Sequence, residues 1–334
     1  MNVGIIGFGY WGTNLVRNFA NLNGVNLKIV VDSSEKRSGE LYKLCPTARL
    51  STSADDVLEN PEIDAAVIAT PVFTHFELAL KALQNGKHVL IEKPMVSSTA
   101  QAEKLIELSV KKSKLLMVDH TFLYTGAVQK MKSLIDQGDI GNIKYFDSTR
   151  INLGLFQSDV NVLWDLAPHD ISILNYLVKE KPYSVQATGV SHTNNEIENI
   201  AYLNVNYDSG FIAHFSCSWT SPVKIRMMLI GGDKKMIVYN DVEPTEKIKV
   251  YDTRYEIKTD EDKKKILVDY RTGDIYTPKI DIKEALSSMV SDFVNSIQTG
   301  NKPVSDYCSG LEVIKILEAS QVSIKNKGKE VLIK

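Results

Sequence analysis

Short apolar runs alternate with amphipathic stretches along the first third of the chain. The runs at 2–7 (NVGIIG), 27–32 (LKIVVD) and 64–70 (DAAVIAT) are short and rich in β-branched residues, as buried strands are. Stretches such as 75–86 (HFELALKALQNG) place apolar residues at helical spacing. Strands that alternate with helices build βαβ units on a parallel sheet. The pattern therefore predicts an α/β domain over residues 1–120.

The rest of the chain has a different pattern. After a helical stretch near 126–137, several runs alternate apolar and polar residues with period two, as in 201–207 (AYLNVNY). Such alternation is typical of an antiparallel sheet with one face covered. A helical stretch at 163–178 interrupts the strands, and two further helices end the chain. We therefore expect a second domain at 121–334, whose last helices can pack back on the first.

Composition narrows the function classes. The chain has 334 residues, with 43% hydrophobic and 24% charged, as in globular proteins of two domains. Its 39 basic and 41 acidic residues nearly cancel, to a net charge of −2. This balance argues against a nucleic acid or an anionic membrane as the main partner. No apolar run approaches the roughly 20 residues of a membrane span.

The cysteines and the N-terminus bear on the compartment. Cys45, Cys217 and Cys308 are odd in number, and their spacing fits neither a zinc site nor a redox pair. The N-terminus lacks the basic segment and cleavage site of a signal peptide. Both observations favour a reducing cytoplasm. The most charged run, 258–265 (KTDEDKKK), mixes both signs and predicts a solvated loop rather than a phosphate-binding patch.

A glycine-rich loop follows the first predicted strand. Residues 7–12 (GFGYWG) fit G-x-G-x-x-G, and Asp32 ends the next strand 20 residues after Gly12. In a dinucleotide site the glycines form a tight turn, admit a pyrophosphate and allow close helix packing, while the acidic residue binds ribose hydroxyls. Because Asp32 would repel a 2′-phosphate, the motif favours NAD over NADP, although Ser33, Ser34 and Arg37 weaken that preference. The alternative is a purely structural turn.

A lysine stands just past another predicted strand. Glu92, Lys93 and Pro94 follow the run HVLI, and ligands of open α/β sheets bind outside the carboxyl ends of strands. A lysine there suits a proton shuttle or a donor to a substrate hydroxyl. Pro94 would fix the backbone around the lysine, and the peptide bond before Pro94 could be cis. An ordinary surface turn is an equal alternative.

The stretch 163–174 (LWDLAPHDISIL) combines helical spacing with polar groups. Asp165 and His169 are four residues apart, so they share a helix face and can enter one cleft. Pro168 suits a first turn, which places the helix start just before Asp165. Histidine is suited to acid–base work at neutral pH. The alternative is structural. Asp165 would then only interact with the positive end of the helix dipole, and His169 would only form hydrogen bonds within the fold.

Four segments together resemble the glucose–fructose oxidoreductase/inositol dehydrogenase (Gfo/Idh/MocA) family. They are GIIGFGYWG, ATPVFTH, GKHVLIEKPM and WDLAPHD, and their order and spacing agree along the whole chain. The resemblance implies an N-terminal Rossmann domain with a doubly wound parallel sheet. It also implies a C-terminal α+β domain on an open, mostly antiparallel sheet that often mediates oligomerisation.

The resemblance also implies roles for individual residues. Lys93 and His169 would flank the reacting carbinol, with Asp165 beside them, and Asp170 would face elsewhere. The expected cofactor-binding residues are Gly7, Phe8, Gly9, Tyr10, Trp11, Gly12, Asp32, Ser33, Arg37, Thr70, Pro71, His75, Glu92 and Lys93. We expect NAD and no metal.

One segment departs from the family pattern. Many members carry an arginine and a proline where this chain has Leu123 and Gly126. His120 and Tyr124 remain nearby and either shape a sugar pocket or pack at the domain junction. Further polar residues precede the 163–174 helix and are candidates for substrate contact: Arg150, Asn152, Gln157 and Asn161.

These observations predict an NAD-dependent oxidoreductase that transfers hydride between nicotinamide and a secondary alcohol or ketone of a sugar. The motifs look most like members that act on nucleotide sugars, often at C3. The alternatives are a glycoside hydrolase that retains NAD and a non-catalytic NAD-binding regulator. We expect a small-molecule partner and a homodimer or homotetramer formed through the C-terminal sheet.

Overall fold

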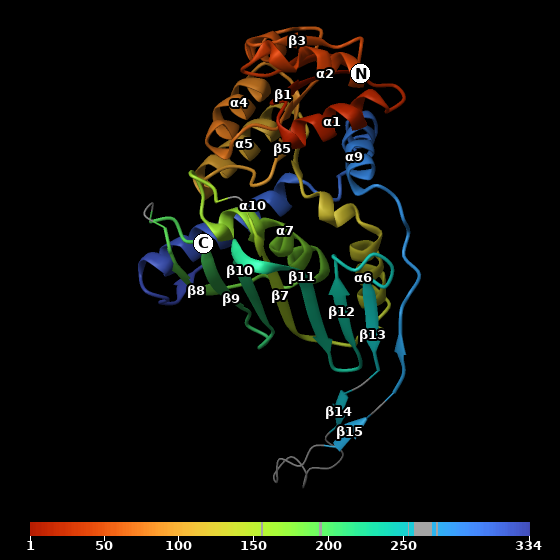
Figure 1. The fold of residues 1–334 in the computed structure, drawn as a ribbon, viewed down its shortest axis with the longest axis vertical. Coiled ribbons are helices and arrows are strands. Elements are labelled where there is room, and N and C mark those ends of the chain that lie inside the picture. The colour runs from red at the N-terminus through yellow and green to blue at the C-terminus, as the bar shows by residue number, and fades with distance from the viewer. Residues whose placement is uncertain (155, 194–195, 253, 257–268, 272) are drawn as a thin grey trace. The chain divides into compact units, whose positions relative to one another are not determined.

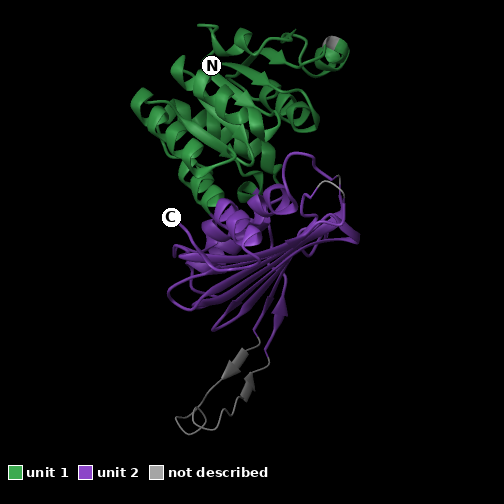
Figure 2. Cartoon of the chain, turned by 90° about the vertical axis from the view of Figure 1, so that its left-hand side faces the viewer, with its two compact units in different colours: residues 1–124, 283–315 green, residues 125–282, 316–334 purple. Residues whose placement is uncertain are grey.

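The computed structural model describes residues 1–154, 156–193, 196–252, 254–256, 269–271 and 273–334. The charged run at 258–265, expected to be a loop, lies outside the described residues. The described chain forms two compact units (Figure 2). Unit 1 comprises residues 1–124 and 283–315, and unit 2 comprises residues 125–282 and 316–334.

Unit 1 is built on a six-stranded parallel sheet of order β3-β2-β1-β4-β5-β6. Figure 1 shows helices lying around this sheet. Its strands are β1 (Asn2–Ile6), β2 (Asn26–Val31), β3 (Arg49–Ser51), β4 (Ala65–Ile68), β5 (His88–Glu92) and β6 (Leu116–Asp119). Four residues in a row are buried in β4 and in β6, as expected when helices cover both faces of a parallel sheet. The predicted doubly wound parallel sheet is confirmed.

Helices connect these strands. They are α1 (Tyr10–Ala20), α2 (Ser38–Leu44), α3 (Asp55–Leu58), α4 (Val72–Gln84) and α5 (Thr99–Lys112), with short 3-10 turns at Glu35–Arg37 and Thr121–Tyr124. A late helix, α9 (Ala285–Thr299), joins the same unit and packs on α1. Phe19 and Phe293 meet there edge to face, with ring centroids 6.3 Å apart.

Unit 2 is built on a nine-stranded sheet of order β16-β13-β12-β11-β7-β10-β9-β8-β17. Among the described strands of this sheet, β7 and β10 pair in parallel and the other pairs are antiparallel, so the predicted mostly antiparallel sheet is also confirmed. The strands are β7 (Ile143–Leu153), β8 (Ser184–Val190), β9 (Ile200–Asn206), β10 (Ile212–Ser218), β11 (Thr220–Gly232), β12 (Met236–Asn240), β13 (Ile248–Tyr251), β16 (Ile275–Tyr276) and β17 (Val331–Leu332). β14 (Arg254–Glu256) pairs separately with β15 (Asp269–Arg271).

Two helices of this unit, α6 (Gly126–Asp136) and α7 (Val162–Leu177), pack on each other, and α7 also packs on the middle strands β7, β9 and β10. The last helix, α10 (Tyr307–Lys325), is divided between the two units. The predicted break at residue 120 lies close to this division, in which residues 121–124 and 283–315 cluster with the first unit.

The start of α7 differs from the prediction. The helix begins at Val162, and its N-cap is Asn161, whose side-chain oxygen accepts the Trp164 N–H at 3.1 Å. Pro168 therefore lies in the second turn and not in the first. Since proline has no N–H, the Trp164 carbonyl loses its usual partner in the helix.

Candidate functional site

The candidate site of unit 1 follows from the strand order of its sheet. β1 and β4 are neighbours whose connections run to opposite sides, and ligands of open α/β sheets bind beside such a switch point. Five of the strands that end at this edge are followed, within two residues, by a residue that the sequence singled out. These are Gly7, Asp32, Thr70, Lys93 and His120.

The glycine loop has the geometry of a phosphate cradle. Gly7 has φ +101°, and a Cβ on it would lie 2.4 Å from the Ala69 carbonyl oxygen. A Cβ on Gly12 would lie 2.0 Å from the Gly7 carbonyl oxygen, so α1 can pack this closely only with glycine. A Cβ on Gly9 would meet no atom of the described residues within 4 Å. The open space beside Gly9, at the N-terminus of α1, therefore fits a dinucleotide pyrophosphate.

The other residues of the loop differ in exposure. Tyr10 and Trp11 are exposed on the first turn of α1, with ring centroids 5.3 Å apart. Phe8 is fully buried, so only its backbone is accessible to a ligand.

Asp32 and Arg37 lie beyond the end of β2. The Asp32 Oδ1 accepts the Ser34 N–H at 3.0 Å, which holds the carboxylate at the strand end, and Ser33 is exposed. The Arg37 guanidinium donates to both carboxylate oxygens of Glu40, at 2.8 and 2.7 Å. It also lies 4.5 Å from the Phe8 ring centroid. Arg37 is therefore engaged by Glu40, while Asp32 keeps a second carboxylate oxygen for a ligand.

A buried histidine holds the loop after β4. The Thr70 and Pro94 carbonyl oxygens lie 2.7 Å from His75 Nε2 and 3.0 Å from Nδ1. Burial lowers the pKa of His75, so the ring is neutral at pH 7 and donates from one nitrogen only. His75 therefore ties the Thr70–Pro71 loop to the segment after β5, where the Lys93–Pro94 peptide bond is cis.

A cluster of titratable groups forms where β5 and β6 end. The two strands pair Glu92 with Asp119, and Lys93 and His120 follow them directly. Glu92, Asp119 and His120 are buried, whereas Lys93 is half-buried. Burial, followed by the charge of Lys93, lowers the pKa of His120 to about 3, so this imidazole is neutral. The cluster presents one cation and one neutral imidazole beside two buried carboxyl groups.

Tyr124 has a structural partner. Its hydroxyl donates to Asp292 Oδ2 at 2.7 Å and accepts the Ser305 N–H at 3.2 Å. Tyr124 is 8% exposed. These contacts join the 3-10 turn to α9, which supports packing over the substrate contact we had expected.

Asp165 and His169 lie on α7 in unit 2, one turn apart, and both are half-buried. The fully buried Trp219, between β10 and β11, donates its indole N–H to Asp165 Oδ2 at 3.0 Å. Trp219 also packs on Phe156, with ring centroids 5.6 Å apart. The indole therefore fixes the carboxylate that stands one turn before His169. Sequence patterns gave no sign of this contact, because Trp219 is 54 residues away from Asp165.

Removing the indole N–H is expected to weaken this arrangement. Trp219→Phe keeps the ring packing but leaves Asp165 without a charge-assisted hydrogen bond worth about 1.5–3 kcal/mol. If Asp165 acts in the reaction, we expect kcat to fall by about tenfold or more. Steady-state kinetics measures this effect. Phe156→Leu, which changes the packing of the indole only, serves as the control, and an equal loss in both variants would contradict the role of the N–H.

Arg150 has a different role from the one predicted. Its guanidinium is 3% exposed and donates to both carboxylate oxygens of Asp170, with Nε 2.9 and 3.0 Å away. Ser148 donates to the same carboxylate at 2.7 Å. Asp170, which we expected to face elsewhere, thus fixes α7 to β7. The predicted contact between Arg150 and substrate is corrected to an internal ion pair.

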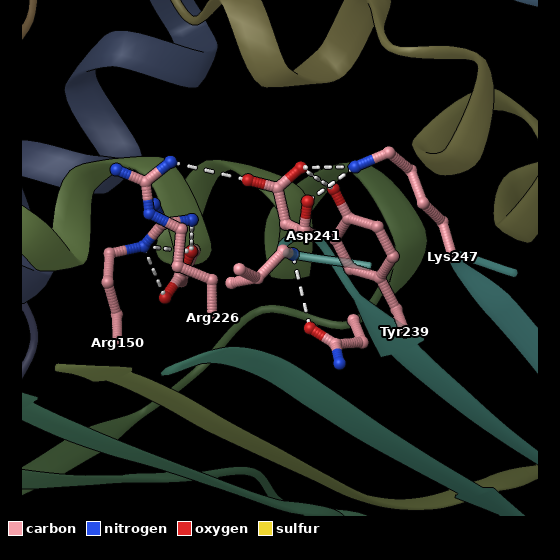
Figure 3. Close-up of polar contacts among 8 residues, drawn as sticks. Arg150, Arg226, Tyr239, Asp241 and Lys247 are labelled. Carbon is pink, nitrogen blue, oxygen red and sulfur yellow. Dashed lines mark hydrogen bonds and ion pairs between the residues drawn. The ribbon is translucent and has the colours of Figure 1, made fainter. Parts of the chain in front are cut away.

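Cross-strand neighbours extend this ion pair. Arg226 on β11 faces Arg150 on β7, and a second carboxylate, Asp241, balances this second cation. Figure 3 shows Asp241 between Arg226 on one side and Tyr239 and Lys247 on the other. The Tyr239 hydroxyl donates to Asp241 at 3.0 Å. The network holds the strands under α7 in register.

The remaining candidates lie near α7 in the same unit. Asn152 is half-buried on β7, and Gln157 is half-buried in the segment before the helix. Asn161 is buried, and its amide nitrogen donates to Glu198 and Gln321 at 3.0 and 2.7 Å. Asn161 is thus used by the fold, whereas Asn152 and Gln157 stay candidates for substrate contact.

Within the described ranges, no three histidine, cysteine, aspartate or glutamate side chains gather in a way that could hold a metal ion. No helix among the described residues is long and apolar enough to cross a membrane.

Comparison with known proteins gives two family matches. Residues 1–120 match the model of an oxidoreductase family with an NAD-binding Rossmann fold, and residues 128–238 match the GFO/IDH/MocA C-terminal domain. The UDP-N-acetylglucosamine 3-dehydrogenase of Acidithiobacillus ferrooxidans is 26% identical over 96% of this chain and 95% of its own length. The scyllo-inositol 2-dehydrogenase (NAD(+)) of Bacillus subtilis is 27% identical over 71% of this chain and 72% of its own.

A solved structure of the Acidithiobacillus ferrooxidans enzyme, GnnA, has the same fold. It superposes with a TM-score of 0.82 over 98% of both chains, at 24% identity.

Proposed function

Because this chain belongs to the Gfo/Idh/MocA family of oxidoreductases, we propose that it transfers hydride between NAD and a ring carbon of a nucleotide-linked sugar, at C3. The observation that carries the proposal is the similarity to a UDP-N-acetylglucosamine 3-dehydrogenase over 96% of the chain. Inositol dehydrogenases are also similar, but over less of the chain. The reaction class follows from the family, and the substrate is our inference.

Unit 1 supplies the cofactor-binding residues. The open space at Gly9 and the first-turn N–H groups of α1 would receive the pyrophosphate. Asp32 would accept hydrogen bonds from the ribose hydroxyls, and the Thr70–Pro71 loop, held by His75, would line the cofactor near the nicotinamide. When bound, NAD supplies the hydride acceptor that the amino acid side chains lack. Glu92, Lys93, Ser33 and Arg37 complete the proposed set.

Three side chains would act on the substrate. Lys93 would donate a hydrogen bond to the reacting oxygen and lower the energy of the alkoxide that develops there. His169 would take the hydroxyl proton during oxidation and return it during reduction. Asp165, fixed by the Trp219 indole, would orient the imidazole or bind a neighbouring hydroxyl. His120 and Asn152 would contact the sugar.

Charge at the end of β2 supports NAD over NADP. Asp32 would repel a 2′-phosphate. Arg37, which weakens the predicted preference for NAD, is paired with Glu40. The similar scyllo-inositol dehydrogenase is named for NAD(+).

Neutralising Asp32 is therefore expected to shift cofactor preference. Asp32→Asn keeps the shape of the side chain and an acceptor for the Ser34 N–H but removes its charge. We expect kcat/KM for NAD to fall about 10- to 100-fold, the effect of about 1.5–3 kcal/mol, while NADP loses less or gains. Asp64→Asn is the control, because Asp64 precedes β4 at the opposite edge of the sheet. An unchanged NAD/NADP ratio would contradict ribose recognition by Asp32.

The experiment that tests the function is a spectrophotometric assay of NADH formation. Purified protein receives NAD or NADP together with UDP-sugars, free sugars or inositols in turn. Turnover with NAD and UDP-sugars supports the proposal, whereas turnover with inositols only would reject the nucleotide-sugar substrate. Release of sugar without net NADH would favour the hydrolase that retains NAD. NAD binding with neither reaction would favour the regulator.

Assembly and compartment are also inferred. Exposed residues alternate with buried ones on β9 and β10, where Tyr202 and His214 stack with ring centroids 6.3 Å apart. The open face of the sheet therefore suits contact with a second copy, which analytical ultracentrifugation would detect. The free thiols Cys45, Cys217 and Cys308 agree with a cytoplasmic location.

A further inference from the structure

Two carboxyl groups are buried against each other at the ends of β5 and β6. The parallel register pairs Glu92 directly with Asp119, and their side chains are 8% and 3% exposed. Two such groups in a buried site cannot both carry a charge without a large cost in free energy. The pairing of two buried carboxyl groups therefore favours protonation of one of them.

Their hydrogen bonds assign the proton. Asp119 Oδ1 accepts the Thr121 N–H at 3.0 Å and the Thr121 hydroxyl, as an ionised carboxylate does. Glu92 Oε2 accepts a single N–H, from Lys93, at 2.9 Å. Burial, and then the charge of Asp119, raise the pKa of Glu92 well above its ordinary value. Burial raises the pKa of Asp119 to about 6, against the Thr121 hydrogen bonds and a hydrogen bond from Glu92. The hydrogen bonds and the directions of the two pKa shifts together assign the proton to Glu92 and the negative charge to Asp119.

Among the groups around the pair, Lys93 carries the opposite charge. The Lys93 charge lowers the pKa of both carboxyl groups, so the ammonium and the pair attract each other. His120 is neutral, and burial raises the pKa of Tyr124, so its hydroxyl is neutral as well. Among these groups, the pair carries the negative charge that balances Lys93.

We propose that Glu92 and Asp119 share one proton and act together as positioning residues for Lys93, holding a single negative charge against its ammonium. Glu92 contributes the donor, Asp119 contributes the charge, and Thr121 anchors Asp119. The idea that this arrangement serves catalysis rests on the proposed function, because it is Lys93 that would meet the substrate. The shared proton itself depends only on the geometry of unit 1.

The test compares the wild-type protein with Glu92→Gln and with the double variant Glu92→Gln/Asp119→Asn. Glu92→Gln imitates the protonated carboxyl and keeps the charge of Asp119, while the double variant removes the charge. Infrared spectroscopy of protein with ¹³C-labelled carboxyl groups detects a protonated carboxyl at pH 8. The rate at which trinitrobenzenesulfonate labels Lys93, followed by peptide mass spectrometry, reports on its ammonium without any need for turnover. Exposed Lys111 on α5 is the internal control.

We expect a protonated-carboxyl band in the wild type that Glu92→Gln removes. Lys93 labelling should stay within about twofold in Glu92→Gln and rise clearly above that in the double variant, because the double variant removes the negative charge that attracts the ammonium. As pH falls through about 6, the second proton should neutralise the pair, and Lys93 stabilisation should be lost. Circular dichroism and the Tm of each variant verify that it is folded.

Two results would overturn the proposal: a wild-type spectrum without this band at pH 8, or equal Lys93 labelling in all folded variants. If both readouts behave as expected but no sugar is oxidised, the proton-sharing pair stands and the proposed function fails.

Discussion

Replacing Lys93 by methionine is expected to lower kcat by about 10²- to 10⁴-fold, the usual contribution of a positioned acid–base group. The side chain stands after β5 at the edge of the sheet where cofactor and substrate would meet. Methionine keeps most of the aliphatic stem and removes the hydrogen-bond donor. Because the cofactor would be held mainly by the glycine loop and Asp32, the Kd for NAD should stay within about threefold. Stopped-flow measurement of kcat and fluorescence titration of NAD separate the two effects.

His169→Gln completes this prediction. We expect a loss of the same order, and the double variant Lys93→Met/His169→Gln should be little worse than either single variant, because groups that act on one proton transfer are not additive. Lys111→Met on the exposed side of α5 is the control for a lysine of the same unit. Activity that survives both substitutions would assign the chemistry to other residues.

Removing one partner of the buried ion pair in unit 2 should have the second large effect. Arg150→Met leaves the Asp170 carboxylate, 2% exposed, without its guanidinium. Such an uncompensated charge costs about 3–5 kcal/mol. In a unit of this size we expect the Tm of the affected transition to fall by about 10 °C. Scanning calorimetry resolves this transition, since two units need not unfold together.

The matched control is the double variant Arg150→Met/Asp170→Leu. It removes both charges and fills similar space, so it should recover most of the lost Tm. Lys132→Met, which breaks a pair between the half-buried Lys132 and the exposed Asp136, should change Tm by about 1–2 °C at most. If Arg150→Met had a normal Tm but a raised KM, the substrate contact that we first expected for Arg150 would be restored.

Local patterns predicted the fold because they arise from local physics. Alternating strands and helices led to the parallel sheet, and period-two alternation led to the antiparallel one. The glycine loop could also be predicted from the sequence. The positive φ at Gly7 and the close contact at Gly12 both favour glycine over any residue with a side chain. The predicted start of α7 was wrong because we expected Pro168 to lie in the first turn. The helix instead begins after Asn161, whose side chain caps it.

Partnerships across the chain could not be read in this way. Arg150 and Asp170 pair through the packing of α7 on β7, and a sequence does not state which strand residue a helix residue will meet. The contact between Trp219 and Asp165 and the pairing of Glu92 with Asp119 also join residues that are far apart in the sequence. Asp119 ends β6, and it acquires a chemical role only through its pairing with Glu92.

The transfer of deuterium from a labelled substrate tests the central claim most directly. UDP-N-acetylglucosamine carrying deuterium at C3 would be incubated with NAD and the purified protein, and the cofactor would be analysed by mass spectrometry and NMR. Our account predicts that the deuterium appears at C4 of the nicotinamide in the NADH formed, and that Lys93→Met abolishes this transfer. A cofactor that stays unlabelled while the same protein reduces NAD with another substrate would contradict C3 of a nucleotide sugar as the site of reaction. A protein that binds NAD but reduces it with no member of the sugar panel would contradict hydride transfer itself.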